Sequence, residues 1–196
     1  MAAIKEASRF FMRDDPVFKS LYAVTERLKG MGIPYAVAGG LSLVAHGHDR
    51  TTEDVDILVT PDGLKTVHEK LDGLGYVPPF KGSKHLRDTQ HGVRIEFLVT
   101  GQFPGDGKPK PVSFPDPRDC SVDIDGIQYV QLPKLIELKL ASGMTNSGRL
   151  KDLADVQELI RVLKLELAYA ANLNPYVQEK FKELWQGVRQ DSSPEQ

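Results

Sequence analysis

The sequence predicts an α/β fold, because segments with the apolar spacing of helices alternate with short apolar runs that are typical of buried strands. The chain has 196 residues, of which 40% are hydrophobic, so it is long enough for one globular domain with a modest appendage. It contains 25 lysines and arginines against 27 aspartates and glutamates. This balance argues against a surface that is basic all over, although it leaves room for a local basic face.

The first half of the chain predicts two strands, each followed by a helix. Asp15-Pro16 is a helix cap with a first-turn proline, and apolar residues then recur at helical spacing as far as Gly30. The run 34–38 is a short buried strand, and Gly39-Gly40 turns it into a brief helix that ends near Gly47. A second buried strand is predicted over 54–59, and a helix capped by Thr60-Pro61 is predicted to end at Gly75.

The second half predicts strands first and then helices. Residues 84–99 have the pattern of two strands joined at His91-Gly92, and 122–130 that of a hairpin around Asp125-Gly126, a type I′ turn signal. Between them, prolines and glycines predict a loop over 103–118, and long loops of this kind usually serve a site or are mobile. Helices are expected over 133–142, 149–164 and 175–188.

These elements predict an α/β core over residues 1–132, a C-terminal helical extension over 133–190 and a frayed tail over 191–196. The apolar side of the last helix, which contains Trp185, is either core or an interface with a second copy of the chain. The sequence does not fix the oligomeric state.

The compartment is predicted from what the sequence lacks. The single cysteine, Cys120, cannot form an internal disulfide, and the N-terminal residues lack the apolar segment of a signal peptide. The longest nearly apolar run, 33–45, is shorter than the roughly 20 residues that cross a bilayer. We therefore expect a cytoplasmic protein without membrane insertion.

Two carboxylates are predicted to lie side by side at Asp54 and Asp56. Residues two apart in a strand share a face, so these side chains point one way while Val55 and Ile57 point the other way. Like charges at short separation are tolerated only if one is protonated or a cation lies between them. Carboxylate and water ligands suit Mg²⁺, which completes its coordination with substrate phosphates.

The glycine pair predicts a phosphate site next to these acids. Where a strand ends in Gly39-Gly40 and runs into a helix, backbone N–H groups are exposed at a positive helix terminus and an anion can approach closely. A phosphate site beside a metal-binding acid pair indicates a nucleoside triphosphate. Each feature also has a purely structural interpretation, as a tight turn for the glycines and as a solvent-facing strand edge for the acids.

The stretch AGGLSLVAHGHDRTTEDVDILV, residues 38–59, resembles the glycine-pair and acid-x-acid signature of the nucleotidyltransferase superfamily, whose fold is shared with DNA polymerase β. It is similar to small prokaryotic members, including abortive-infection-type toxins and antibiotic-modifying nucleotidyltransferases. The segments 139–143 and 148–155 also resemble the basic helices that follow the core in these members, so the likeness covers roughly residues 20–165. Many relatives carry Ser where this chain has Gly40.

The resemblance implies a mixed-sheet α/β nucleotidyltransferase fold with a helical C-terminal extension, and it implies the site residues. Asp54 and Asp56 would bind two Mg²⁺ ions together with a third carboxylate from a later strand, for which we select Glu96 within an apolar strand. Arg94 beside Glu96 allows the alternative of a surface ion pair, and Asp88 is the substitute for the third acid. The nucleotide-binding candidates are Gly39, Gly40, Ser42, Arg50, Thr52 and Lys151.

Several of these residues have equally plausible ordinary roles. Arg50, Thr51 and Thr52 are also typical of a polar loop, and Lys151 could pair with Asp155 on a solvated helix face. Asp123 repeats the acid-x-acid spacing with Asp125, but it precedes a turn, where Asp is favoured for backbone reasons. The pair His46 and His48 has no third soft ligand nearby, which disfavours a zinc site.

The predicted reaction is transfer of a nucleoside monophosphate from a nucleoside triphosphate to an acceptor hydroxyl. Residues 81–118 carry seven basic and four acidic side chains, a net charge of +3 that is compatible with an RNA or tRNA end and equally with a small hydroxylated molecule. The resemblance to toxin-type members implies a possible toxin–antitoxin role with a cognate antitoxin. The alternative is a non-catalytic module that binds a nucleotide or a protein.

Overall fold

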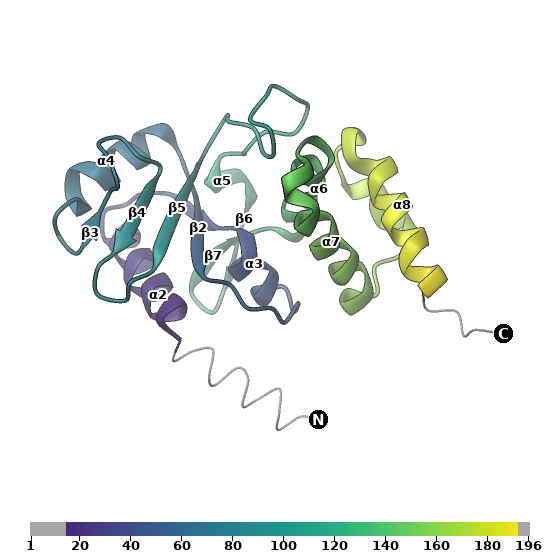
Figure 1. Cartoon of the computed structure of the whole chain (residues 1–196), viewed down its shortest axis with the longest axis horizontal. Coiled ribbons are helices and arrows are strands. Elements are labelled where there is room, and N and C mark those ends of the chain that lie inside the picture. The colour runs from purple at the N-terminus through teal and green to yellow at the C-terminus, as the bar shows by residue number, and fades with distance from the viewer. Residues whose placement is uncertain (1–14, 192–196) are drawn as a thin grey trace.

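The computed structural model describes residues 15–191, and within that range seven strands form one sheet in the order β3-β4-β5-β2-β1-β7-β6 (Figure 1). Strand β2 runs parallel to β5 and β1 runs parallel to β7, whereas the other neighbouring strands are antiparallel. This confirms the predicted mixed sheet. The strands are β1 Tyr35–Val37, β2 Asp54–Val59, β3 Tyr76–Val77, β4 His85–Asp88, β5 Arg94–Val99, β6 Ser121–Ile124 and β7 Ile127–Val130.

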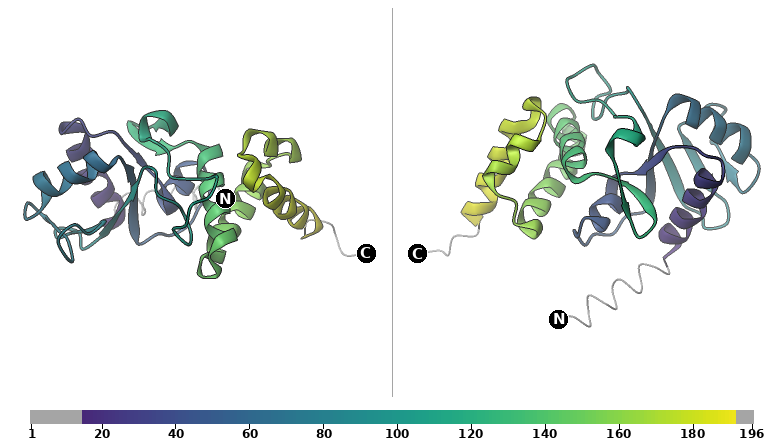
Figure 2. Two further views of the ribbon diagram at one scale, coloured as in Figure 1. Left: turned by 90° about the horizontal axis from the view of Figure 1, so that it is seen from above. Right: turned by 180° about the vertical axis from the view of Figure 1, so that it is seen from behind.

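Helices precede, connect and follow these strands. The α-helices are α2 Pro16–Gly30, α3 Gly39–Ala45, α4 Pro61–Leu71, α5 Pro117–Cys120, α6 Leu132–Thr145, α7 Leu150–Leu163 and α8 Pro175–Asp191, with 3₁₀ turns η1 Ser147–Arg149 and η2 Leu167–Asn172. Figure 1 shows α6, α7 and α8 together at one end of the molecule, and the two views of Figure 2 show the same separation from the outer strands. Most of the predicted tail lies outside the described residues.

Local signals in the sequence set most element boundaries. The side chain of Asp15 accepts a hydrogen bond from the amide of Val17 and so caps α2 as predicted. Asp125 and Gly126 both have positive φ, as a type I′ hairpin requires. Helix α4 ends four residues before the predicted Gly75, because the chain turns extended at Asp72 and then pairs as the two-residue strand β3, which the sequence does not predict.

The sheet has a separate apolar core on each face. Ala36 and Leu58 face a core that also contains the apolar residues of α6, α7 and α8. Val55 and Ile57, which alternate with the acids of β2, face a second core formed with α2 and α4. Side chains alternate along a strand, so the side chains of Asp54 and Asp56 lie on the same face as Leu58, toward the C-terminal helices.

Helix α8 belongs to the first core rather than to an exposed face. Its residues Val177, Phe181 and Val188 are buried against the neighbouring helices, and the indole N–H of Trp185 donates to the carbonyl of Leu165 at 2.9 Å. Of the two roles that the sequence leaves open for this apolar side, the structure shows core packing.

The proline-rich segment between β5 and α5 is held against α6 by polar contacts. The amide of Phe114 donates to the carbonyl of Gln102 at 2.8 Å. The buried Nζ of Lys110 donates to the carbonyl of Pro104 at 2.6 Å and to the hydroxyl of Thr145 in α6 at 3.1 Å. The segment is irregular as predicted, but it ends in the short helix α5, which was not predicted.

Cys120 is a free, buried thiol at the end of α5, and burial raises its pKa to about 11.

Among the described residues, none of the helices has the length and apolarity that a membrane crossing requires.

Candidate active site

Gly39, at the start of α3, lies directly against the carboxylate of Asp56 on β2. Its φ of +57° is a conformation that residues with a side chain rarely adopt. A Cβ added there would overlap Oδ2 of Asp56 and would lie 2.6 Å from its Cγ. At Gly40 an added Cβ would lie 2.7 Å from Oγ1 of Thr52. The glycine pair therefore leaves space for the side chains of Asp56, in β2, and Thr52, which lies just before β2.

Asp56 occupies an unfavourable position for a charged carboxylate. It retains some exposure to a cavity but is otherwise surrounded by protein, and its pKa is raised to about 6. Burial is the largest cause, followed by the negative charge of Glu96 and, more weakly, that of Asp54, while Lys139 and Arg149 oppose the shift. A group shifted in this way is a common feature of functional sites.

The third predicted acid, Glu96, lies beside this pair but has a partner of its own. In the parallel register of β2 and β5, Glu96 pairs with Asp56 and Arg94 pairs with Asp54. Oε2 of Glu96 accepts a hydrogen bond from the guanidinium of Arg94 at 3.2 Å and lies 3.8 Å from Nδ1 of His85. The structure thus contains both features that the sequence suggested, an acid next to Asp56 and an ion pair with Arg94.

The donors at this site suit a magnesium ion that the protein coordinates only in part. Within residues 15–191, no three His, Cys, Asp or Glu side chains are grouped so that they could hold a metal ion. Asp54 and Asp56 nevertheless present two carboxylates on one face, and Mg²⁺ is commonly bound through one or two carboxylates plus waters and substrate phosphates. The donor set fits Mg²⁺ that binds together with a nucleotide better than it fits a closed protein cage.

The acids form one wall of a cavity of about 800 Å³ between the sheet and the C-terminal helices. Cations line the opposite wall, and the segment between β5 and α5 contributes further residues, two of them aromatic. These cations are Arg50, Lys139, Arg149 and Lys151, whereas a fifth, Lys84, lines the cavity from the residue before β4. The residues from the segment between β5 and α5 include Phe103, Pro104, Gly105 and Phe114. A cavity of this size lies within the range of small-molecule sites. Asp152 and Asp155 also line it on the side of the helices, where they pair with Lys139.

Most nucleotide-binding candidates from the sequence line this cavity, and one does not. Gly39, Gly40, Thr52 and the two cations Arg50 and Lys151 are all at its surface. Ser42 is fully buried, and its hydroxyl donates to the carbonyl of Val130 at 3.4 Å, so the structure does not place it at the cavity. Helical periodicity explains the difference, because Ser42 lies on the side of α3 that packs on the core.

The remaining candidates have local structural roles. Asp88 accepts hydrogen bonds from the amide of Gln90 and from the amide and ring of His91, which stabilise the turn before β5. Asp123 caps the hairpin turn through the amide of Gly126 at 3.0 Å. His46 contacts the carbonyl of Val130 at 2.8 Å.

Sequence reasoning assigned no role to several residues of the basic wall. Lys139 and Arg149 line the cavity, and Asp155 accepts hydrogen bonds from Arg50 and Lys139 rather than from Lys151, the partner that i,i+4 spacing suggests. The available signal was the recurrence of charged residues in two otherwise apolar helices. Asp152 and Asp155 are buried, and buried charges are usually paired.

We expect Asp56→Asn to stabilise the metal-free protein by up to about 3 kcal/mol at pH 8 and by less than about 1 kcal/mol near pH 4. Asp56 has a folded-state pKa of about 6 against an ordinary value of 3.8, so the folded state resists its ionisation. Stability from this group is therefore lost as the pH rises from 3.8 to 6 and stays lost above pH 6. Urea unfolding of both proteins in EDTA at the two pH values tests this, and an equal gain at both would contradict it.

Solved structures of similar fold are nucleotidyltransferases. ANT(2")-Ia in complex with adenylyl-2"-tobramycin aligns with a TM-score of 0.52 at 10% identity, over 89% of this chain and 98% of that chain. An antigenic nucleotidyltransferase-like protein from Paracoccidioides brasiliensis aligns with a TM-score of 0.51 at 17% identity, over 91% of this chain and 89% of that chain. No protein-family model matches the sequence, and a search of curated proteins finds no match.

The chain therefore has the nucleotidyltransferase fold, an α/β architecture with a mixed sheet and helices at its C-terminal end. The resemblance of residues 38–59 to that superfamily agrees with this fold.

Proposed function

We propose that this protein is a Mg²⁺-dependent nucleotidyltransferase that moves a nucleoside monophosphate from a nucleoside triphosphate to an acceptor hydroxyl. The observation that carries the proposal is the position of Asp56. Its carboxylate lies against Gly39, next to Asp54 and opposite Glu96, and faces Lys139 and Arg149 across one cavity. A nucleotide polyphosphate with a divalent cation has the charge distribution that complements these two walls.

In the proposed reaction the acceptor oxygen attacks the α-phosphorus in line, a new P–O bond forms, and the bond to the β-phosphate breaks so that pyrophosphate leaves. Asp54 and Asp56, with Glu96 beside them, would bind Mg²⁺ together with the phosphates of the nucleotide, and the metal would lower the pKa of the attacking hydroxyl and neutralise phosphate charge. Asp56 or Glu96 would accept the hydroxyl proton. Lys139 and Arg149 provide positive charge on the opposite side of the cavity.

The size of the cavity favours a small hydroxylated acceptor. A volume of about 800 Å³ accommodates a nucleotide together with a second small molecule, and Phe103 and Phe114 offer apolar surface for it. ANT(2")-Ia was solved with adenylyl-2"-tobramycin, which is an adenylylated small molecule.

The test is incubation of the protein with each labelled nucleoside triphosphate, Mg²⁺ and a cell extract, followed by identification of the labelled component. A labelled small molecule together with released pyrophosphate supports the proposal. A labelled RNA whose modification falls steeply with salt would support transfer but redirect the choice of acceptor. Nucleotide binding without Mg²⁺ dependence and without pyrophosphate release would instead favour a non-catalytic binding module.

A toxin role is tested separately by expression in growing cells. Growth arrest that Asp54→Asn relieves would support it, because that variant removes a cavity-lining carboxylate and keeps the side-chain shape.

A further inference from the structure

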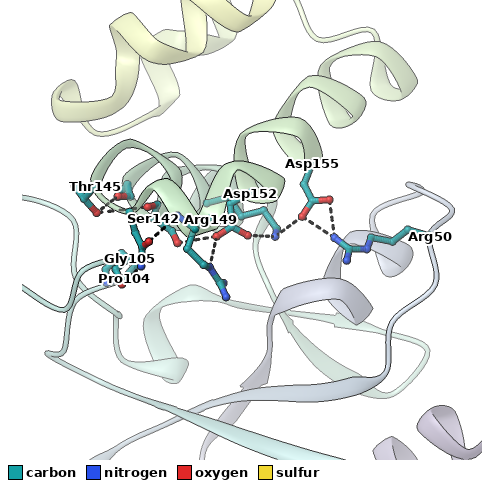
Figure 3. Close-up of polar contacts among 12 residues, drawn as sticks. Arg50, Pro104, Gly105, Ser142, Thr145, Arg149, Asp152 and Asp155 are labelled. Atoms are coloured by element: carbon teal, nitrogen blue, oxygen red, sulfur yellow. Dashed lines mark hydrogen bonds and ion pairs between the residues drawn. The ribbon is translucent and has the colours of Figure 1, made fainter.

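Six polar side chains on the basic wall form one connected network, which we call the Lys139 cluster. Its members are Arg50, Lys139, Ser142, Arg149, Asp152 and Asp155. They come from the loop between α3 and β2, from α6, and from η1 and α7. Figure 3 shows Ser142, Arg149, Asp152 and Asp155 along the helices, with Arg50 reaching Asp155 from the opposite segment. The cluster therefore ties the C-terminal helices to the loop that precedes the acid strand.

Lys139 is the centre of this network and is shared by two carboxylates. Its Nζ donates to Oδ1 of Asp152 at 3.0 Å and to Oδ2 of Asp155 at 2.7 Å. Only 7% of Lys139 and 5% of each aspartate is exposed. Charges buried to this extent must be paired and hydrogen-bonded to be tolerated, so the three side chains hold one another in fixed positions.

Each carboxylate also holds an arginine while leaving part of its guanidinium free to bind another group. One terminal nitrogen of Arg50 donates to both oxygens of Asp155, at 2.6 and 2.7 Å. Nε of Arg149 donates to Oδ2 of Asp152 at 2.9 Å, which leaves both terminal nitrogens of Arg149 without a protein acceptor among the described residues. A guanidinium has five N–H donors in a planar fork, the arrangement that suits phosphate oxygens.

The free end of Arg149 faces the site rather than bulk solvent alone. Figure 3 shows its guanidinium pointing away from the helices and toward the strands, and both arginines line the cavity that contains Asp56. The cluster carries three cations and two carboxylates, so its net charge suits an anion.

We infer that Arg149 and Arg50 bind the phosphate oxygens of the nucleoside triphosphate, and that Asp152, Asp155 and Lys139 are positioning residues that fix the two guanidinium groups before the nucleotide binds. This inference rests on the proposed function and assigns a role to the charged pattern at positions 139–155. The competing explanation is that the cluster only fastens the helices to the preceding loop.

The inference is tested by isothermal titration calorimetry with Mg²⁺ and the α,β-methylene analogue of whichever nucleoside triphosphate the wild type binds most tightly. The corresponding monophosphate is measured in parallel. We expect Arg149→Gln to weaken binding of the triphosphate analogue roughly 10- to 100-fold, with a much smaller effect on the monophosphate. Arg149 is 59% exposed in its side chain, and Asp152 keeps Lys139 and Ser142 as partners, so the variant should fold.

Arg161→Gln is the matched control. It removes an arginine of α7, the helix that follows Arg149, which pairs with Glu158 and does not line the cavity, and we expect unchanged binding. A wild-type affinity in Arg149→Gln, or an equal loss for triphosphate and monophosphate, would overturn the assignment of Arg149.

The positioning role of Asp155 is tested by a double-mutant cycle. If Asp155 acts through Arg50, then Asp155→Asn should weaken triphosphate binding in the wild type but add little in the Arg50→Gln background. Additive losses would overturn the positioning role. Should Asp155→Asn not fold, Asp152→Asn combined with Arg149→Gln gives the equivalent cycle. A wild type that binds no α,β-methylene nucleoside triphosphate analogue would refute the proposed function as well, whereas normal wild-type binding with unaffected variants would refute this inference alone.

Discussion

Asp56→Asn is expected to reduce nucleotide transfer by at least about a hundredfold while the fold remains intact. The asparagine has the same shape, so it fits beside Gly39, but it can neither carry the negative charge that a divalent cation requires nor accept the hydroxyl proton. Pyrophosphate release with labelled nucleoside triphosphate measures the effect, and circular dichroism confirms the fold.

Asp123→Asn is the matched control for this variant. Asp123 has the same acid-x-acid spacing, but it lies in the β6–β7 hairpin and accepts hydrogen bonds from the amide of Gly126 and the side chain of Gln128. An asparagine can keep the bond from Gly126, so turnover should stay at the wild-type level. Unchanged turnover in Asp56→Asn would refute the proposed mechanism, and an equal loss in both variants would show that the effect is not specific to the cavity.

Gly39→Ala is expected to abolish transfer to a similar extent and to destabilise the protein by about 1–3 kcal/mol. Two effects combine at this position. Alanine is strained at a φ of +57°, and its Cβ would overlap the carboxylate of Asp56, which must rotate away from α3. The variant should therefore lose activity beyond what its stability loss explains, as turnover measured well below its melting temperature would show.

Gly73→Ala separates these two effects. Gly73 also has a positive φ, of +77°, but an added Cβ would meet nothing within 4 Å. We expect a comparable strain penalty with full activity. If Gly39→Ala keeps wild-type turnover, or if Gly73→Ala loses activity to the same degree, then the close approach of Gly39 to Asp56 has no functional role.

The sequence predicted those elements whose signals are local. The cap at Asp15, the strand over 54–59 and the Asp125-Gly126 hairpin depend on residues within a few positions of each other, and all three are confirmed. Strand β3 was missed because its two residues are too few to show a period. The end of α4 was misplaced because the chain becomes extended at Asp72, which bridges to Tyr76, and the following residues pair with β4 as β3.

At the site too, the sequence predicted the relations between residues that are close in the chain, but not those between residues that packing brings together. Spacing predicted that Asp54 and Asp56 share a face, and the glycine pair predicted an open backbone beside them. Spacing did not distinguish Ser42, which faces the core, from Gly40, which faces the cavity. It also paired Asp155 with Lys151, whereas packing brings Arg50 from about one hundred positions away.

By itself the sequence determined the alternation of elements, the shared face of the acid pair and the turn at the glycines, because strand periodicity and backbone sterics act between near neighbours in the chain. Only the tertiary structure decided that the acid pair beginning at Asp54 lines a cavity, whereas the turn signal at Asp125-Gly126 had already set apart the pair beginning at Asp123. It also decided which cations oppose the acids. Burial and Coulomb interactions between distant segments depend on where packing places each side chain, and that information is not carried by local spacing.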